Sequence, residues 1–393
     1  MASTQGLSTD VRPDEVDHFN LTNKGFDASA GALAQLTTLA ENKNQPPTSH
    51  IHGSATSSES HTWLSRILPQ TTISDLEAKF HMGNYVLDRK TSEKSFEAMS
   101  IYVRVGMHLL YYGSQQEKAL HWQKTVDLLK AQSEKMGQEY DSPDSKQHII
   151  PFIDSFSLGQ TMVEMVKPDP DSYATFNDFF AREIKESARP IDEPDNDLAT
   201  SSPADCRLTA FPTVDLATKY WIKGFGFSLE KLLGSSDLAA QFDGGSLVIA
   251  RLAPQDYHRW HAPVSGRVES INEIPGAYYT VNPQAICQEG TLDVFCENRR
   301  SVMTLRRTST GSPIAIVAVG AMLVGSIKYV EGVEVGADVR RGQCLGAFYY
   351  GGSTVIVVYP PGEVQLDADL VKNSTELQME TLVKVGWSLG RKM

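Results

Sequence analysis

The run Thr354-Val-Ile-Val-Val-Tyr359 begins directly after Tyr350-Gly-Gly-Ser353, and it is the segment that indicates the fold most clearly. β-Branched and aromatic residues favour strands, while paired glycines mark a tight turn or a bulge where a strand begins. Two runs of the same kind, Ser246-Leu-Val-Ile-Ala250 and Ile314-Ala-Ile-Val-Ala-Val319, lie upstream. The chain after residue 200 is therefore predicted to be mainly β.

Two segments within this β-rich part are loosely alike. They are His261-Ala-Pro-Val-Ser-Gly-Arg-Val268 and Val333-Glu-Val-Gly-Ala-Asp-Val-Arg-Arg-Gly-Gln-Cys-Leu-Gly346. Each alternates apolar residues with turn glycines, as paired hairpins of a small closed barrel do. We therefore expect a barrel-like β domain over residues 196–393.

The preceding region has helical spacing instead. Ser74-x-x-Glu77 and Ser114-x-x-Glu117 are capping boxes, in which side chains satisfy the free amides of a first helical turn. Apolar residues recur at helical spacing after each box, at Met99, Val103, Met107 and Leu110, and then at Ala119, Trp122, Val126 and Leu129, with an end near Gly137. A further helix is expected over residues 175–187, where Arg189-Pro190 stops it.

These patterns divide the chain into three parts and predict an α+β fold. Residues 1–70 are expected to be a flexible tail, because the stretch 46–60 is too polar to bury anything. Residues 71–195 are expected to be helical and residues 196–393 β-rich, with the junction in the polar stretch 190–200. His50 and His52 form an H-x-H in the tail, which is typical of a solvated linker more than of a metal site.

Composition excludes several classes of protein. The 393 residues carry 36 Lys plus Arg against 48 Asp plus Glu, a formal charge of −12. This charge disfavours electrostatic binding of nucleic acid or anionic lipid over a broad surface. Four cysteines without a C-x-x-C pair support neither a zinc ribbon nor a disulfide framework, and a reducing compartment fits best. The charged N-terminus lacks a secretory signal, and the longest apolar run, 314–324, is shorter than the roughly 18 residues of a membrane span.

Three short motifs contain candidate catalytic residues, and each motif can also be explained by an ordinary structural role. Asp205 follows Ser202-Pro203, where an aspartate usually caps a turn. His258 and His261 follow Asp256 closely, and this spacing leaves metal binding, acid–base work and simple core packing all open. A lone Gly351-Gly352-Ser353-Thr354 is usually a bulge or a tight turn.

In combination, these motifs resemble the pyruvoyl-dependent phosphatidylserine decarboxylases, and the eukaryotic type II branch most of all. The resemblance runs from about Phe176 to the C-terminus, with Cys206 as a small departure where the family commonly has Gly or Ser. It rests on Phe176-x-x-Phe-Phe-x-Arg182-x-x-Lys185, Arg189-Pro-Ile191, Ser202-Pro-x-Asp205, Phe242-Asp-Gly-Gly245, Arg251-Leu-Ala-Pro-x-Asp-Tyr-His258-Arg-x-His261-x-Pro263, Pro275-Gly-x-Tyr-Tyr-Thr-Val-Asn-Pro283, Asn298-x-Arg300, Val319-Gly-Ala-x-x-Val-Gly-Ser326, Leu345-Gly-x-Phe348 and Gly351-Gly-Ser-Thr354.

The chemistry of such an enzyme needs an electron sink. A decarboxylase of an α-amino acid commonly forms a Schiff base with a cofactor carbonyl, and the sequence offers no convincing lysine and phosphate cradle for pyridoxal phosphate. A carbonyl made from the chain itself would serve. A Gly-Ser bond suits its formation, because glycine leaves the attacked carbonyl unshielded.

The resemblance then implies a role for each residue. Asp205 would orient His261, His261 would be the base for the Ser353 hydroxyl, and Ser353 would become the pyruvoyl group that forms a Schiff base with substrate after cleavage at Gly352–Ser353. His258 would be the second imidazole, for proton handling or substrate contact, although the sequence does not assign either job to one histidine. No metal is expected, and Asp256, Tyr257 and Arg259 are assigned structural or supporting roles.

Cleavage would leave a β chain of 352 residues and an α chain of 41 residues that stay together as one heterodimeric unit, and a further homodimer would match the family. The expected substrate is phosphatidylserine, and the alternative is a small free aromatic amino acid. A non-catalytic carrier module is disfavoured, because no convincing lysine lies at a hairpin tip. We expect a cytoplasmic protein with peripheral contact to an endomembrane, in which the helices over 74–137 would be the docking surface.

Overall fold

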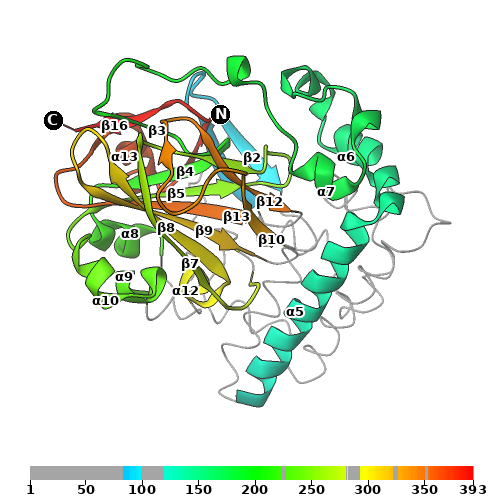
Figure 1. Ribbon diagram of the computed structural model, residues 1–393, viewed down its shortest axis with the longest axis horizontal. Helices are drawn as coiled ribbons and strands as arrows, with labels where there is room; N and C mark the ends of the chain where they lie inside the picture. The colour runs from blue at the N-terminus through cyan, green and yellow to red at the C-terminus, as the bar shows by residue number, and fades with distance from the viewer. Residues whose placement is uncertain are drawn as a thin grey trace, which may run out of the picture.

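The computed structural model describes residues 83–98, 119–222, 227–279, 281, 293–321, 326–349 and 353–392. A ten-stranded open sheet forms its centre (Figure 1). In spatial order the strands are β11 (Asp338–Val339), β7 (Gly266–Ile274), β8 (Arg300–Arg307), β9 (Pro313–Gly320), β13 (Ser353–Tyr359), β5 (Ser246–Leu252), β4 (Cys206–Phe211), β15 (Glu380–Val383), β1 (Gly83–Asp88) and β2 (Lys94–Ala98). The run that opens at Ser353 is thus an inner strand, antiparallel to both β9 and β5.

Strand β13 is buried along its whole length, because both faces of the sheet are covered. Side chains alternate across a strand, so Val355 and Val357 enter one hydrophobic cluster while Ile356 and Val358 enter the other. This two-sided burial accounts for an apolar run without polar interruptions. The core therefore lies on both sides of β13, and the strand is anchored by its two neighbours and by both clusters.

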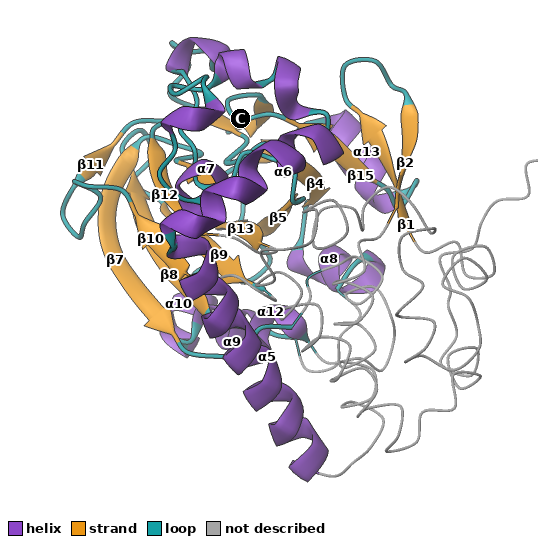
Figure 2. Ribbon diagram, turned by 90° about the vertical axis from the view of Figure 1, so that its right-hand side faces the viewer, coloured by secondary structure: helices purple, strands orange, loops and turns teal. Residues whose placement is uncertain are grey.

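Helices cover one face and short strands the other. The helical face carries α5 (Ala119–Asp141), α6 (Ile149–Ser155), α7 (Phe176–Phe180), α8 (Val214–Tyr220), α9 (Leu229–Leu233), α10 (Ser236–Ala240) and α12 (Val294–Glu297), and Figure 2 shows α5 as the longest of them. The opposite face packs against β6 (Arg259–His261), β10 (Ser326–Tyr329), β12 (Cys344–Tyr349), the small sheet of β3 (Ala199–Ser201), β14 (Gln365–Leu366) and β16 (Ser388–Arg391), and helix α13 (Ala368–Thr375). The α+β fold class is confirmed.

The expectation of a closed barrel is wrong for the described strands. The large sheet has two separate edges, β11 and β2, with no hydrogen-bonded seam between them. The two similar glycine-punctuated segments do pair with each other, because β6 pairs with β12 and β7 pairs with β11. The alternating pattern thus indicated that these two segments form paired strands. A barrel closes only if the edge strands of the sheet also pair with each other, and the alternating pattern does not identify the edge strands.

The structure also differs from the expected helices at three places. Residues 83–98 form a β-hairpin, and its strand β1 adds to the sheet in parallel with β15. Helix α7 ends at Phe180, because residues 183–185 pair as an extended segment with residues 164–166. Helix α5 continues past Gly137 to Asp141. The tail over 1–70, His50, His52 and both capping boxes lie outside the described residues.

No helix in the described ranges is both long enough and apolar enough to cross a membrane.

Candidate active site

The candidate residues gather at one edge of the large sheet. Arg251 of β5 pairs with Arg207 of β4 on one side and with Thr354 of β13 on the other. Strand β5 ends next to these three paired residues, whereas β4 and β13 begin next to them. Asp205 and Ser353 therefore lie at the same edge of the sheet. The loop after β5 runs along that edge and carries His258.

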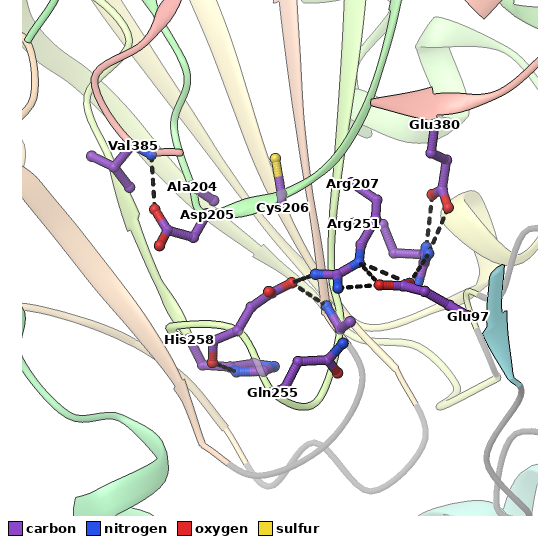
Figure 3. Close-up of polar contacts among 12 residues, drawn as sticks. Glu97, Ala204, Asp205, Cys206, Arg207, Arg251, Gln255, His258, Glu380 and Val385 are labelled. Atoms are coloured by element: carbon purple, nitrogen blue, oxygen red, sulfur yellow. Dashed lines mark hydrogen bonds and ion pairs between the residues drawn. The ribbon is translucent and has the colours of Figure 1, made fainter. Parts of the chain in front are cut away.

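Asp205 is held in a fixed position by cationic and backbone donors. Its carboxylate accepts hydrogen bonds from Arg189 Nε at 3.0 Å and Nη2 at 2.6 Å, and from the Val385 amide at 2.9 Å. Arg189 in turn forms an ion pair with Glu164 at 2.9 Å. Figure 3 shows the Asp205 side chain directed toward Val385. Charge-assisted bonds of this kind fix the orientation of the carboxylate.

His261 lies beside the segment that carries Asp205. Its amide donates to the carbonyl of Pro203 at 2.7 Å, and its ring lies 5.6 Å from the Tyr257 ring. Burial lowers the pKa of His261 to about 4, while the negative charge of Asp205 opposes this shift. Within the described part of the chain, Nδ1 of His261 has no hydrogen-bond partner. A neutral imidazole with a free nitrogen can act as a base at neutral pH.

His258 is fully buried and its tautomer is set by the backbone. Nδ1 lies 2.9 Å from the carbonyl oxygen of Asp256, so it donates its proton there and leaves the lone pair on Nε2. The ring stacks on Phe180 with centroids 3.9 Å apart. Burial, with the nearby charges of Arg182 and Arg207, lowers the pKa of His258 to about 3. Among described residues, nothing hydrogen-bonds its Nε2.

Ser353 is the first residue of β13 and is fully buried. Its hydroxyl oxygen makes no hydrogen bond to any described residue, and the same is true of the neighbouring Thr354 hydroxyl. Most buried hydroxyls are hydrogen-bonded, so a hydroxyl without a partner among the described residues is a candidate functional group. Gly351 and Gly352, the other half of the expected cleavage site, lie outside the described residues.

Next to His258, a chain of ionic contacts joins residues of β2, β4, β5 and β15 (Figure 3). Arg207 forms an ion pair with Asp256 and binds both oxygens of Glu97, from Nε at 3.0 and 2.9 Å. Arg251 binds both oxygens of Glu380, at 2.7 and 2.5 Å. Asp256 also accepts the Ala253 amide at 2.8 Å. The loop that carries His258 is thereby tied to the sheet.

The structure brings the expected residues to one place but does not join them by direct bonds. Within the described residues, no hydrogen bond links Asp205, His261, His258 and Ser353 to one another, although the charge of Asp205 acts on His261. No three His, Cys, Asp or Glu side chains in the described ranges are placed to hold a metal ion. The site therefore offers neutral bases, a buried hydroxyl and a fixed carboxylate.

Sequence reasoning missed the partners of these residues. Arg189 was recognised only as part of a motif and as a helix stop, yet it is the main contact of Asp205. Asp256 was assigned a structural or supporting role, but its partner Arg207 was given none, and the position of Arg207 two residues after Asp205 was the one available signal. Glu97 and Glu380 are far from the site in sequence, and no local pattern identifies them.

Comparison with known proteins gives consistent results. Residues 176–390 match the family model described as Phosphatidylserine decarboxylase. The chain is 44% identical over 308 residues to "Phosphatidylserine decarboxylase proenzyme 3" of Schizosaccharomyces pombe, which covers 78% of this chain and 31% of that protein. It is 41% identical over 336 residues to "Phosphatidylserine decarboxylase proenzyme 2" of Oryza sativa subsp. japonica, which covers 84% and 53%.

A bacterial relative matches over nearly its whole length. The "Phosphatidylserine decarboxylase proenzyme" of Fusobacterium nucleatum is 36% identical over 304 residues, covering 77% of this chain and 96% of that protein. The chain thus spans about one third of the length of the fission yeast relative and about half of that of the rice relative.

Proposed function

The chain belongs to the phosphatidylserine decarboxylase family, and from this membership we propose that it is a self-processing proenzyme that converts phosphatidylserine to phosphatidylethanolamine and carbon dioxide. The observation that carries the proposal is the buried hydroxyl of Ser353, which bonds no described residue and lies at the same sheet edge as Asp205 and His258.

In the self-processing step, Ser353 Oγ attacks the carbonyl carbon of residue 352 after losing its proton to His261. The acyl group moves from nitrogen to oxygen, so the peptide bond becomes an ester. Loss of the Ser353 α-proton expels the carboxylate of residue 352 and leaves dehydroalanine, and water then releases ammonia to give an N-terminal pyruvoyl group. Asp205, held by Arg189, stabilises the protonated form of His261.

Ser353 fits the role of cofactor precursor on structural grounds. It is enclosed by β5 and β9, and its side chain has no competing bond among the described residues. The pyruvoyl carbonyl supplies an electron sink for the electron pair released when carbon dioxide leaves. His258 then acts at Nε2, where it gives or accepts a proton on the substrate, while its buried surroundings exclude water.

The two chains produced by cleavage would remain one folded unit. Strand β13 of the short chain is bonded to β5 and β9 of the long chain along its whole length. Buried ion pairs also cross the cleavage point, since Glu363 binds Arg307 at 2.9 Å and Glu380 binds Arg251. Association therefore depends on the sheet and the core, with no need for the lost peptide bond. We propose no additional subunit.

The substrate is the lipid rather than a free aromatic amino acid. The names of these relatives all refer to phosphatidylserine, and the shared segment 176–390 includes every proposed site residue. Contact with a membrane surface would be peripheral, on the cytosolic side of an endomembrane.

Intact-mass analysis of the purified protein tests the self-processing directly. Wild type should separate into residues 1–352 and 353–393, with a pyruvoyl group on the shorter chain, and Ser353→Ala should remain a single chain. Ser246→Ala, in the partner strand β5, is the matched control and should be cleaved normally. A wild type that stays uncleaved, or a Ser353→Ala chain that splits, would refute the mechanism.

The substrate is tested by offering phosphatidylserine vesicles and free amino acids in parallel. Carbon dioxide release from the vesicles is the expected result, and release from aromatic amino acids alone would overturn the lipid assignment.

A further inference from the structure

An unbroken series of contacts leads from the N-terminal hairpin to His258 (Figure 3). Glu97 of β2 binds Arg207 of β4 through both carboxylate oxygens. Arg207 forms an ion pair with the Asp256 carboxylate, and the Asp256 carbonyl accepts the Nδ1 proton of His258 at 2.9 Å. Four residues from three separate parts of the chain therefore share one hydrogen-bonded path.

We propose that Glu97 is a positioning residue for His258: it holds Arg207 against Asp256, and through Asp256 it fixes the ring and tautomer of the imidazole that serves decarboxylation. This inference rests on the proposed function and deepens it. It also makes the hairpin over 83–98, which precedes the segment 176–390 matched by the family model, a part of the active site.

The geometry explains why Asp256 needs a partner on the Arg207 side. Asp256 is partly buried, with 13% of its side chain exposed, and its carboxylate is held between the Ala253 amide at 2.8 Å and the Arg207 guanidinium. Its backbone carbonyl is the single described partner of the His258 ring nitrogens. A rotation of the Asp256 peptide would therefore release His258 Nδ1 and let the ring turn or change tautomer.

The geometry equally explains why Arg207 needs Glu97. Its side chain is 4% exposed and has two carboxylate partners, Glu97 and Asp256. Nη2 of the neighbouring Arg251 lies 3.8 Å from Oε2 of Glu97, while the Arg251 guanidinium forms its closer ion pair with Glu380. Without the charge on Glu97, two buried guanidinium groups would face each other with less negative charge between them. Arg207 would shift, and Asp256 would shift with it.

The test replaces Glu97 by Gln, which preserves the shape of the side chain and removes its charge. We measure self-cleavage by intact mass, titrate the pyruvoyl groups with a carbonyl reagent, and determine kcat per pyruvoyl group and KM on phosphatidylserine in mixed micelles. We expect cleavage to proceed, kcat to fall at least tenfold, and KM to stay within about twofold, because displacement of a reacting group by about 1 Å can cost about 10²-fold in rate. Glu97→Asp, which retains the charge, should recover part of kcat.

Two controls separate positioning from stability. Glu93→Gln alters an exposed carboxylate in the turn of the same hairpin and should leave both constants unchanged. Glu380→Gln removes a buried carboxylate from Arg251 and should lower the melting temperature as much as Glu97→Gln, with a smaller effect on kcat per pyruvoyl group.

Each outcome decides the matter. A kcat per pyruvoyl group equal to that of wild type in Glu97→Gln would overturn the inference. So would failure of both Glu97 variants to cleave while Glu380→Gln cleaves, because Glu97 would then serve folding alone. A wild type that neither cleaves nor releases carbon dioxide would instead refute the proposed function, so the two failures are distinguishable.

Discussion

Replacement of Asp205 by Asn should slow self-cleavage strongly while leaving a folded precursor. Asn preserves the shape of the side chain and an oxygen that can accept the Val385 amide. It removes the negative charge that binds Arg189 and that acts on His261. The base then loses the carboxylate that stabilises its protonated form, which in other hydroxyl–imidazole–carboxylate sites slows the reaction about 10⁴-fold. The carboxylate of Asp205 bonds Arg189 and the Val385 amide and not the imidazole of His261 in the described residues, so we expect a smaller loss, of about 10²-fold.

The cost in stability follows from the contacts of Arg189. Removing one partner of a buried ion pair costs about 3–5 kcal/mol. Glu164 still faces Arg189 at 2.9 Å, so part of the charge remains compensated, and we expect about 2 kcal/mol. A domain of this size changes its melting temperature by about 2–4 °C per kcal/mol, so the midpoint should fall by about 4–8 °C.

The assay follows the precursor by pulse labelling and gel electrophoresis, with a thermal melt of the purified chain. Glu164→Gln is the matched control, because it removes the other ion pair of Arg189 and leaves Asp205 in place. It should lower the melting temperature and leave the cleavage half-time unchanged. Cleavage of Asp205→Asn at the wild-type rate, or an equal block in Glu164→Gln, would show that the charge of Asp205 has no specific role.

Three further predictions concern the histidines and the packing of β12. His258→Gln should be cleaved into two chains yet release carbon dioxide about 10²- to 10⁴-fold more slowly, and a block in cleavage would contradict the division of roles. Burial lowers the pKa of His258 to about 3 and that of His261 to about 4, so the unfolded chain binds more protons than the folded chain below pH 6.5. Each histidine should therefore lower the free energy of unfolding by about 1.4 kcal/mol per pH unit as the pH falls from 6.5 toward its folded pKa. Urea melts at pH 7.5 and 5.5 measure this change, and greater stability at pH 5.5 would refute the prediction. Gly346→Ala should lose soluble protein, because a Cβ there would lie 2.2 Å from the Trp260 ring, whereas Gly159→Ala, with open space around it, should behave as wild type.

Local sequence patterns predicted the β part of the fold well. The run 353–359 was expected to be a strand because its residues are β-branched, and it became an inner strand because both faces of the sheet are covered. The two glycine-punctuated segments were expected to be hairpin-like, and they pair with one another. Patterns failed where distant segments compete for hydrogen bonds. Residues 183–185 leave the helical conformation because residues 164–166 offer them an extended partner.

The candidate site divides in the same way. The sequence by itself determined which candidate reactive groups the chain offers, namely Asp205, His258, His261 and Ser353, because a residue type carries its chemistry wherever it lies. Only the tertiary structure decided their partners and protonation. Arg189, Glu164 and the hairpin residue Glu97 reach the site through packing across the sheet. The neutral state of both histidines arises from burial, which depends on every segment that excludes water and is written in no single stretch of the chain.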